Sequence, residues 1–307
     1  MGVLRLGYVH ICVTGMAAAK KHYIDTLGLR LVQEEAGRCY LKGWDEWDHH
    51  SLVLEEGGTG VVKVGFKVAK ADDIDKIEKR ASRFGVTVKR MSKGENFGVS
   101  DGLRIELPST HIVEVYHRQT LVGRDVGVVN PQLYPDDMVG AGVSRLDHIL
   151  LGCDEVNDSE RFFTEVMQMY QTERLVPDLK HQKTSLASWL SASNRGHDVA
   201  LIGGEGYSGK LHHVAFTLED GWPSILHAAQ VFARHDVKID MGPTQHGITR
   251  GKTIYFFDSS GNRNEVFTDG YVAQRDQPTF IWTADQVGRG INGLTRNLPE
   301  TFARSLT

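Results

Sequence analysis

The chain repeats one pattern four times, a strand and a helix followed by several short strands, and this repeat limits the folds open to it. The first unit begins with LGYVHICVTGMAAAKKHYIDTLGL at 6–29, and SRLDHILLGCDEVNDSERFFTEVMQM at 144–169 has the same order of strand, turn and helix. The second and fourth units begin with the strands VKVGFKV at 62–68 and HHVAFTL at 212–218. Short β-rich segments and turns follow each helix. The repeat predicts an α+β fold with two units in each half.

The halves meet at the segment PQLYPDDMVGAG, residues 131–142, where two prolines and two glycines indicate a linker. We therefore expect one domain at 1–135 and a second at 136–307. A tail from about residue 271 falls outside the repeat. It contains Trp282 and ends in LPETFARSL, which is typical of a short amphipathic helix.

Length, net charge and cysteine content limit the number of domains, the classes of binding partner and the cellular compartment. A length of 307 residues suits two domains. The net charge of −4 predicts neither a nucleic-acid partner nor an anionic membrane surface. We expect no membrane span, because no apolar run approaches about 20 residues, and no secretory signal. Three scattered cysteines do not form a disulfide framework, which favours the cytoplasm.

Aligning the two halves brings ionisable residues to equivalent positions. The segment PSTHIVEVY at 108–116 aligns with SSGNRNEVF at 259–267, and VKVGF aligns with HHVAF. At the first strands we expect the two histidines of HICV and HILL to correspond. The alignment gives one set in each half: His10, Lys63 and Glu114, and His148, His213 and Glu265.

Strand alternation indicates which side chains of HHVAFTL face a site. Successive residues of a strand point to opposite faces. His213 shares its face with two small residues, which leaves room for a ligand. His212 shares the other face with Val214 and Phe216, so we expect it to pack on a helix, away from the site. Glu265 lies within a strand, where a carboxylate is costly to bury unless it is paired or bound to a metal.

Two histidines and one carboxylate are the ligand set of non-haem Fe(II) oxygenases. Three ligands on one face of an octahedron leave three adjacent positions, enough for a bidentate substrate and O2. Zinc also accepts these ligands, so ligand type alone does not select the metal. In the first half the ammonium of Lys63 has no lone pair to donate. We therefore predict a metal site in the second half only.

Three further polar residues are candidates for the same site, and each has an ordinary structural alternative. His197 begins HDVALI, an otherwise apolar strand, and could be a strand-start residue that hydrogen-bonds a loop. His246 lies in the loop GPTQHGITRG and could be a solvated turn residue. Tyr255 lies in TIYFFD and could be a half-buried strand aromatic.

The segment GPTQHGITRGKTIYFFDSSGNRNEVF at 242–267 resembles the signature of the type I extradiol ring-cleaving dioxygenases, in particular the catechol 2,3-dioxygenases. RLDHILLG, GHDVALI, KLHHVAFTLE and WTADQVGRG extend the resemblance over most of the chain. It implies the vicinal oxygen chelate fold, in which paired βαβββ modules form two barrel domains. It also implies a homotetramer.

The resemblance further implies cleavage of catechol or an alkylcatechol by O2, outside the two hydroxyls, in the degradation of aromatic compounds. The expected product is 2-hydroxymuconic semialdehyde. The cofactor is then Fe(II), held by His148, His213 and Glu265. His197 matches the family's acid–base histidine, and His246 and Tyr255 match its hydrogen-bond donors to substrate oxygen.

Three alternatives remain open at this point. The same fold hosts glyoxalase-type metalloenzymes and proteins that bind drugs without catalysis, and one fold supports many chemistries. An extradiol enzyme could also act on a different catechol. The sequence shows no basic cluster dedicated to a substrate carboxylate, which favours catechol or alkylcatechols over acidic ones.

Overall fold

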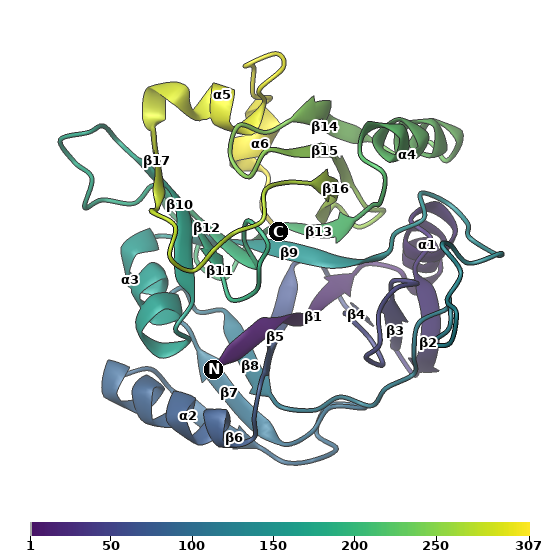
Figure 1. Ribbon diagram of the computed structural model, residues 1–307, viewed down its shortest axis with the longest axis horizontal. Helices are drawn as coiled ribbons and strands as arrows, with labels where there is room; N and C mark the ends of the chain where they lie inside the picture. The colour runs from purple at the N-terminus through teal and green to yellow at the C-terminus, as the bar shows by residue number, and fades with distance from the viewer. Residues whose placement is uncertain (1) are drawn as a thin grey trace.

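The first half of the protein forms one eight-stranded sheet from two βαβββ units (Figure 1). The structure is a computed structural model that describes residues 2–307. The first unit contains β1 (Val3–Val13), α1 (Met16–Lys20), the π-helical turn η1 (Lys21–Thr26), β2 (Arg30–Glu35), β3 (Arg38–Lys42) and β4 (Leu52–Glu56). The second contains β5 (Val61–Val68), α2 (Asp72–Phe84), β6 (Val88–Met91), β7 (Gly102–Glu106) and β8 (Ile112–Tyr116).

The second half repeats this arrangement and adds the tail. Its units are β9 (Arg145–Cys153), α3 (Val156–Arg161), η2 (Phe162–Val166), β10 (Tyr170–Val176), β11 (Ala187–Ser191) and β12 (Val199–Gly203), then β13 (Leu211–Thr217), α4 (Trp222–Arg234), β14 (Ile239–Gln245), β15 (Gly251–Phe257) and β16 (Arg263–Asp269). The tail contains β17 (Phe280–Thr283), the 3-10 turn η3 (Ala284–Gln286), α5 (Val287–Ile291) and α6 (Glu300–Arg304).

In each half, the first strands of the two units join the units into one sheet. The strand order is β2-β3-β4-β1-β5-β8-β7-β6 in the first half and β14-β15-β16-β13-β9-β12-β11-β10-β17 in the second. The central pairs β1–β5 and β9–β13 are antiparallel. The predicted four-unit α+β fold is confirmed. Each barrel is open, because the two edge strands of a sheet do not pair with each other.

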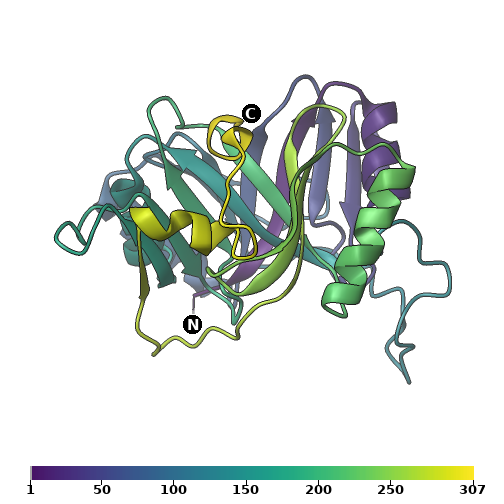
Figure 2. The ribbon, with the colours of Figure 1, turned by 90° about the horizontal axis from the view of Figure 1, so that it is seen from above.

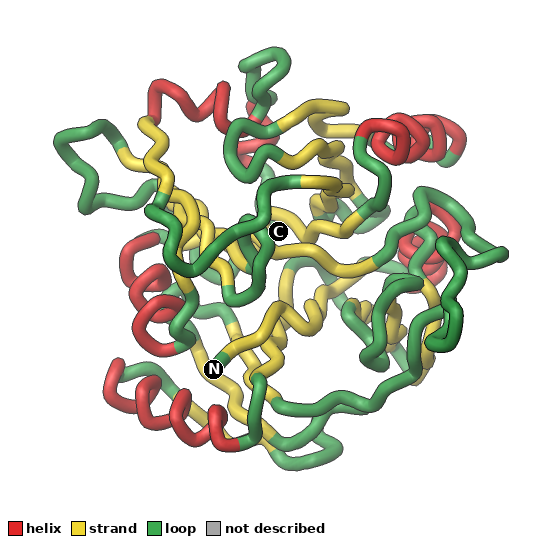
Figure 3. The backbone as a smooth tube through the Cα atoms, viewed as in Figure 1, coloured by secondary structure: helices red, strands yellow, loops and turns green. Residues whose placement is uncertain are grey.

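The strands lie inside and the helices outside (Figures 2 and 3). Helical segments of one half pack on the sheet of the other. The ring of Phe163 in η2 lies 5.9 Å from that of Phe66 in β5, and the ring of Tyr23 in η1 lies 6.3 Å from that of Phe216 in β13. The apolar core is therefore continuous between the sheets. The division at residue 135, within the loop between β8 and β9, stays a prediction.

The register of the central strands corrects the expected equivalence of the two histidines. Val64 pairs with Val9 in the first half, and its counterpart Val214 pairs with Ile149 in the second. The residue before Ile149 is His148, so its counterpart in the first half is Tyr8. The expected match of His10 with His148 is wrong by two residues. That match was based on the identity of the two residues. Structural equivalence is determined instead by the backbone pairing of each strand with its partner.

The first half neutralises its buried carboxylate with its own cations. Glu114 is fully buried. It accepts hydrogen bonds from Arg104 at 2.6 Å, from Asn96 at 2.8 Å and from Lys63 at 3.2 Å, and the hydroxyl of Tyr8 also donates to it. Arg104 lies opposite Glu114 on the neighbouring strand. Tyr255 lies opposite Glu265 at the equivalent position of the second half. These contacts provide the charge that a metal ion would bring.

We expect Lys63→Met to destabilise the protein by about 1–3 kcal/mol, because it removes one cation from a buried carboxylate. Urea unfolding of the apo-protein measures this as a lower midpoint with an unchanged slope. Metal content and turnover should stay at the level of the parent protein. The exposed pair of Lys20 with Glu34 provides the control, and Lys20→Met should leave the midpoint unchanged. A loss of metal in Lys63→Met would contradict a purely structural role.

Candidate metal centre

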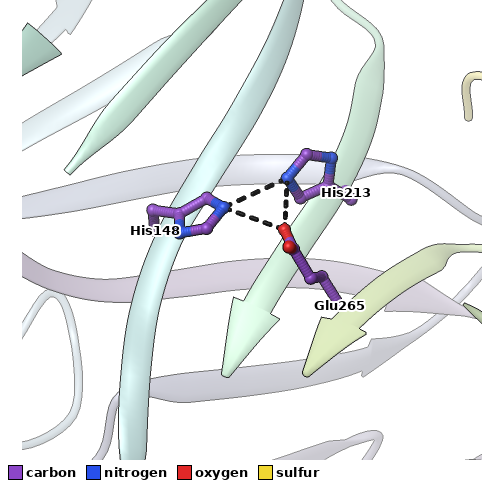
Figure 4. Close-up of side chains that lie close together, drawn as sticks. All are labelled: His148, His213 and Glu265. Atoms are coloured by element: carbon purple, nitrogen blue, oxygen red, sulfur yellow. Dashed lines mark hydrogen bonds and ion pairs between the residues drawn. The ribbon is translucent and has the colours of Figure 1, made fainter. Parts of the chain in front are cut away.

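Three buried side chains from adjacent strands converge on one point (Figure 4). They are His148 on β9, His213 on β13 and Glu265 on β16. Glu265 Oε2 lies 3.0 Å from His148 Nε2 and 3.2 Å from His213 Nε2. The two Nε2 atoms are 3.3 Å apart. The three residues that the alignment of the two halves selected therefore lie close together in the structure.

These separations suit ligands of one first-row metal ion. Two ligand atoms about 2.1 Å from a metal lie about 3.0 Å apart at right angles and about 3.4 Å apart at a tetrahedral angle. The observed values of 3.0, 3.2 and 3.3 Å lie within that range. They fit a divalent cation and do not select between iron, manganese and zinc.

The tautomer of His148 is set by Asp147. Asp147 Oδ1 lies 2.7 Å from His148 Nδ1, and Thr217 donates to the other oxygen at 2.7 Å. Because the carboxylate accepts, Nδ1 is the donor and Nε2 is available as a ligand. Burial lowers the pKa of His148, but hydrogen bonds to Asp147 and Glu265 outweigh it and raise that pKa to about 9. Without a cation, a proton therefore occupies Nε2 at neutral pH, and a metal ion displaces it.

Glu265 remains ionised although it is fully buried. Burial raises its pKa, and the hydrogen bond and the charge of the protonated His148 lower it far more, to well below the usual value. Thr253 donates to Oε1 at 2.5 Å, which leaves Oε2 facing the two histidines. The three groups together offer a cation two imidazole nitrogens and one negative charge.

The other predicted site residues lie beside these ligands. The ring of His197 lies against that of His148, with a centroid separation of 3.9 Å and an angle of 45° between the ring planes. Burial and the neighbouring His148 lower the pKa of His197 well below its usual value, so the ring is neutral at pH 7. His246 Nε2 is 3.0 Å from the hydroxyl of Tyr255. Burial and Glu265 raise the pKa of Tyr255, which keeps that hydroxyl protonated.

All of these histidines and Tyr255 line one cavity of about 200 Å³. Its remaining wall is almost entirely apolar, and none of the described residues that line it is Lys, Arg or Asp. The apolar lining comes from β9–β12, from the loop after β14 and from the tail. It consists of Leu150, Leu175, Trp189, Ile202, Ile248, Val287, Ile291, Leu298 and Phe302. A more open cleft of about 700 Å³ between η1 and residues 235–261 contains none of the predicted metal or acid–base residues.

The expectation that His212 packs on a helix is met by a helix of the tail. Its ring is fully buried and lies 4.8 Å from the ring of Phe302 in α6, so it faces the tail and not a helix of the repeat. The register of β13 shifts between Leu211 and His213, which breaks the alternation on which the expectation rested. Burial and the Arg263 guanidinium lower the pKa of His212 well below its usual value, so this ring is also neutral.

Sequence reasoning also missed Asp147 and the tail helices. Asp147 directly precedes His148, and a carboxylate beside a candidate histidine ligand is the signal that could have identified it. The contribution of α5 and α6 to the cavity carried no comparable signal, since it depends on how the tail folds back over the second sheet (Figure 1).

Comparison with known proteins identifies the family. Residues 145–266 match the family model described as the Glyoxalase/Bleomycin resistance protein/Dioxygenase superfamily, and residues 63–120 match the Catechol 2,3-dioxygenase-like N-terminal domain. The chain is 39% identical to a metapyrocatechase of Pseudomonas sp. (strain CF600), covering 100% of this chain and 99% of the relative. The chain belongs to the metapyrocatechase family of extradiol dioxygenases. It is therefore an enzyme of the dioxygenase class.

Solved structures agree with this assignment. The 2,3-dioxygenase LapB from Pseudomonas sp. KL28 matches with a TM-score of 0.88 and 36% identity, covering 93% of this chain and 99% of that chain. A relative from Geobacillus genomosp. 3, 24% identical over 94% of this chain and 93% of its own length, is a manganese-dependent 2,3-dihydroxybiphenyl 1,2-dioxygenase. Membership of the family thus establishes metal-dependent chemistry and leaves the metal to be assigned.

We expect His213→Ala to lose nearly all bound metal, because it removes one of three ligands. His10→Asn should retain one metal ion per chain, because the side chain of His10 contacts Glu55 and belongs to the first half. Metal analysis after anaerobic loading with Fe(II) and desalting measures both. Equal metal loss in the two variants, or two ions per chain in the parent protein, would contradict a single site in the second half.

Proposed function

We propose that the protein cleaves catechol and alkylcatechols with O2, outside the two hydroxyls, at one Fe(II) held by His148, His213 and Glu265. The observation that supports this most strongly is the convergence of three metal-binding groups at an apolar cavity lined by His197, His246 and Tyr255. Bound Fe(II) would acidify a catechol hydroxyl and allow electron density to pass from catechol to O2. The product would be 2-hydroxymuconic semialdehyde from catechol itself.

The donor set accepts several metals, and the O2 chemistry of the family is the reason that we propose iron. Two histidines and one carboxylate on one face form the triad of non-haem Fe(II) oxygenases. The three remaining positions would accept both catechol oxygens and O2 together. Manganese is the stated metal of one relative, so the choice is tested by loading the apo-protein separately with Fe(II), Mn(II) and Zn(II).

His197 is the proposed acid–base residue. A substrate bound through both oxygens releases one hydroxyl proton, and a neutral imidazole beside the site accepts it. His197 meets this need because burial keeps its ring neutral and because it lies against the ligand His148. The same ring would return the proton to oxygen later in the cycle.

His246 and Tyr255 are the proposed hydrogen-bond partners of substrate oxygen. The hydroxyl of Tyr255 keeps its proton, so it donates. His246 Nδ1 donates to the carbonyl of Ile291, a contact that fixes the ring, so its Nε2 donates to substrate oxygen in the doubly protonated form of the ring. Donors held in this way stabilise charge that develops on oxygen without reorganising.

The apolar wall supports a substrate with hydrogen or alkyl substituents. A substrate carboxylate placed against Leu150, Trp189 and Ile248 would lose water without gaining a cation. The cavity and the family membership both favour the dioxygenase.

Steady-state kinetics of the Fe(II) protein tests the substrate class. Catechol, 3-methylcatechol and 4-methylcatechol should be turned over with a yellow product. 3,4-Dihydroxyphenylacetate should have a kcat/KM on the order of 100-fold lower, because its charge enters an apolar wall. Equal or better turnover of the acid would contradict the proposed substrate class, and the absence of any coloured product from all four would contradict the proposed reaction.

His197→Ala should retain iron and still bind catechol anaerobically, with kcat lower by roughly 10² to 10⁴, the usual effect of losing an acid–base group. Catechols with an electron-withdrawing substituent ionise without help and should lose less rate. The exposed His181 provides the control, and His181→Ala should behave as the parent protein. Loss of iron in His197→Ala would make that residue a ligand, and equal losses for all catechols would remove its role as base.

Assembly and location follow as smaller proposals. We expect a homotetramer in the cytoplasm. The loop between β8 and β9 exposes Val128, Val129 and Leu133, a surface that another copy of the chain would cover. Cys12, Cys39 and Cys153 are free, which is consistent with a reducing compartment. No helix in residues 2–307 is both long enough and apolar enough to span a bilayer. Light scattering of the purified protein measures the assembly directly.

A further inference from the structure

The contacts of His212 are not used by the chemistry above. This ring is fully buried between a predicted metal ligand and the tail. Its Nδ1 lies 2.7 Å from Nδ1 of His213, and its Nε2 lies 2.7 Å from the carbonyl oxygen of Phe302. The chain of contacts therefore runs from α6 through His212 to His213.

The direction of each hydrogen bond follows from the chemistry of its end groups. A carbonyl oxygen only accepts, so His212 Nε2 is the donor to Phe302. A neutral imidazole with its proton on Nε2 has a lone pair on Nδ1. His213 Nδ1 must then donate to His212, which leaves the lone pair of His213 on Nε2. That nitrogen is the one 3.2 Å from Glu265 and 3.3 Å from His148 Nε2.

We infer that His212 is a positioning residue for the metal centre. By donating to the carbonyl of Phe302 and accepting from His213, it fixes the tautomer and the ring orientation of His213. The inference rests on the proposed metal site. The two histidine ligands are then oriented in different ways. His148 donates directly to the Asp147 carboxylate, whereas His213 donates to a neutral ring whose acceptor is backbone.

The tail is held firmly enough to serve this role. The buried guanidinium of Arg263 donates to the carbonyls of Thr301 at 2.7 Å and Ser305 at 2.8 Å, on either side of Phe302. The backbone of Thr307 pairs with that of Leu211 in both directions, at 2.6 and 3.0 Å. These contacts hold the carbonyl of Phe302 in place beside the strand that carries His213.

The same segment forms part of the cavity wall. Leu298, Phe302 and Ala303 line the cavity together with His213. The residue that orients the ligand and the residues that limit the space for substrate thus belong to one folded unit. A change in the position of α6 should therefore alter the metal site in two ways, through the hydrogen bonds of His212 and through the shape of the cavity wall.

The test compares two variants of His212. His212→Phe retains an aromatic ring against Phe302 but provides no acceptor, so His213 loses the partner that selects its tautomer. We expect Fe(II) to bind about 10- to 100-fold more weakly, the usual effect of losing an outer hydrogen-bond partner of a ligand. His212→Gln offers an amide oxygen to His213 and an amide N–H to the carbonyl, so it should recover most of the lost affinity. Competition with a chelator measures both without any turnover.

A spectroscopic readout separates positioning from general damage. In the Co(II)-substituted protein, each ligand histidine with a protonated Nδ1 should give one exchangeable, paramagnetically shifted proton resonance. The parent protein should show two, and His212→Phe should lose or shift the one from His213 only. His111→Phe provides a matched control, because His111 is a buried histidine of the first half that likewise contacts a backbone carbonyl, that of Lys210 in the second half, at 3.0 Å. It should leave both resonances and the iron affinity unchanged.

The outcomes distinguish this inference from the proposed function. If the parent protein binds metal at the three ligands, and His212→Phe folds with parental affinity and both resonances, the relay is wrong and the metal site remains. If His212→Gln binds iron as weakly as His212→Phe, the relay is wrong as well. If the parent protein does not bind metal at those residues, the proposed function itself fails.

Discussion

The buried carboxylate of Glu265 is the constraint on which the second half depends. Burial opposes its charge, and the contact with the protonated His148 favours the charge strongly enough to lower its pKa well below the usual value. The hydrogen bonds of both histidines direct an Nε2 lone pair toward the same point as Glu265 Oε2. Such a cluster is stable with a cation or, in its absence, with a proton on His148. The metal centre is thus a consequence of how three strands place a charge inside a core.

The first half meets the same constraint with its own side chains. Glu114 occupies the position of Glu265, and Lys63 and Arg104 replace His213 and Tyr255. Because these cationic side chains neutralise Glu114, the first half needs no bound metal ion. The two halves then share a continuous apolar core in which helical segments of each cover the sheet of the other. We therefore propose that the repeat yields one half that binds the metal and one half that supports it.

The sequence alone predicted the four units, the two long helices and the residues that converge at the metal centre. The pairing of Glu114 with Glu265 was visible because the last strands of the halves align without gaps. The equivalence of Tyr8 with His148 was not visible, because it depends on strand register and not on residue identity. The sequence predicted that His212 packs on a helix, but not that this helix belongs to the tail, and a register shift breaks the alternation of β13 at this point. The tail's contribution to the cavity depends on long-range packing that no local pattern encodes.

Anomalous X-ray diffraction at the iron edge, on crystals of the anaerobically loaded protein, is the most direct test of the central claim. The account predicts one iron peak per chain, bonded to Nε2 of His148, Nε2 of His213 and one carboxylate oxygen of Glu265, with His197, His246 and Tyr255 unbonded around it. It predicts no peak beside Glu114. A peak in the first half, or coordination by His197 or His246 in place of one of the three ligands, would contradict it.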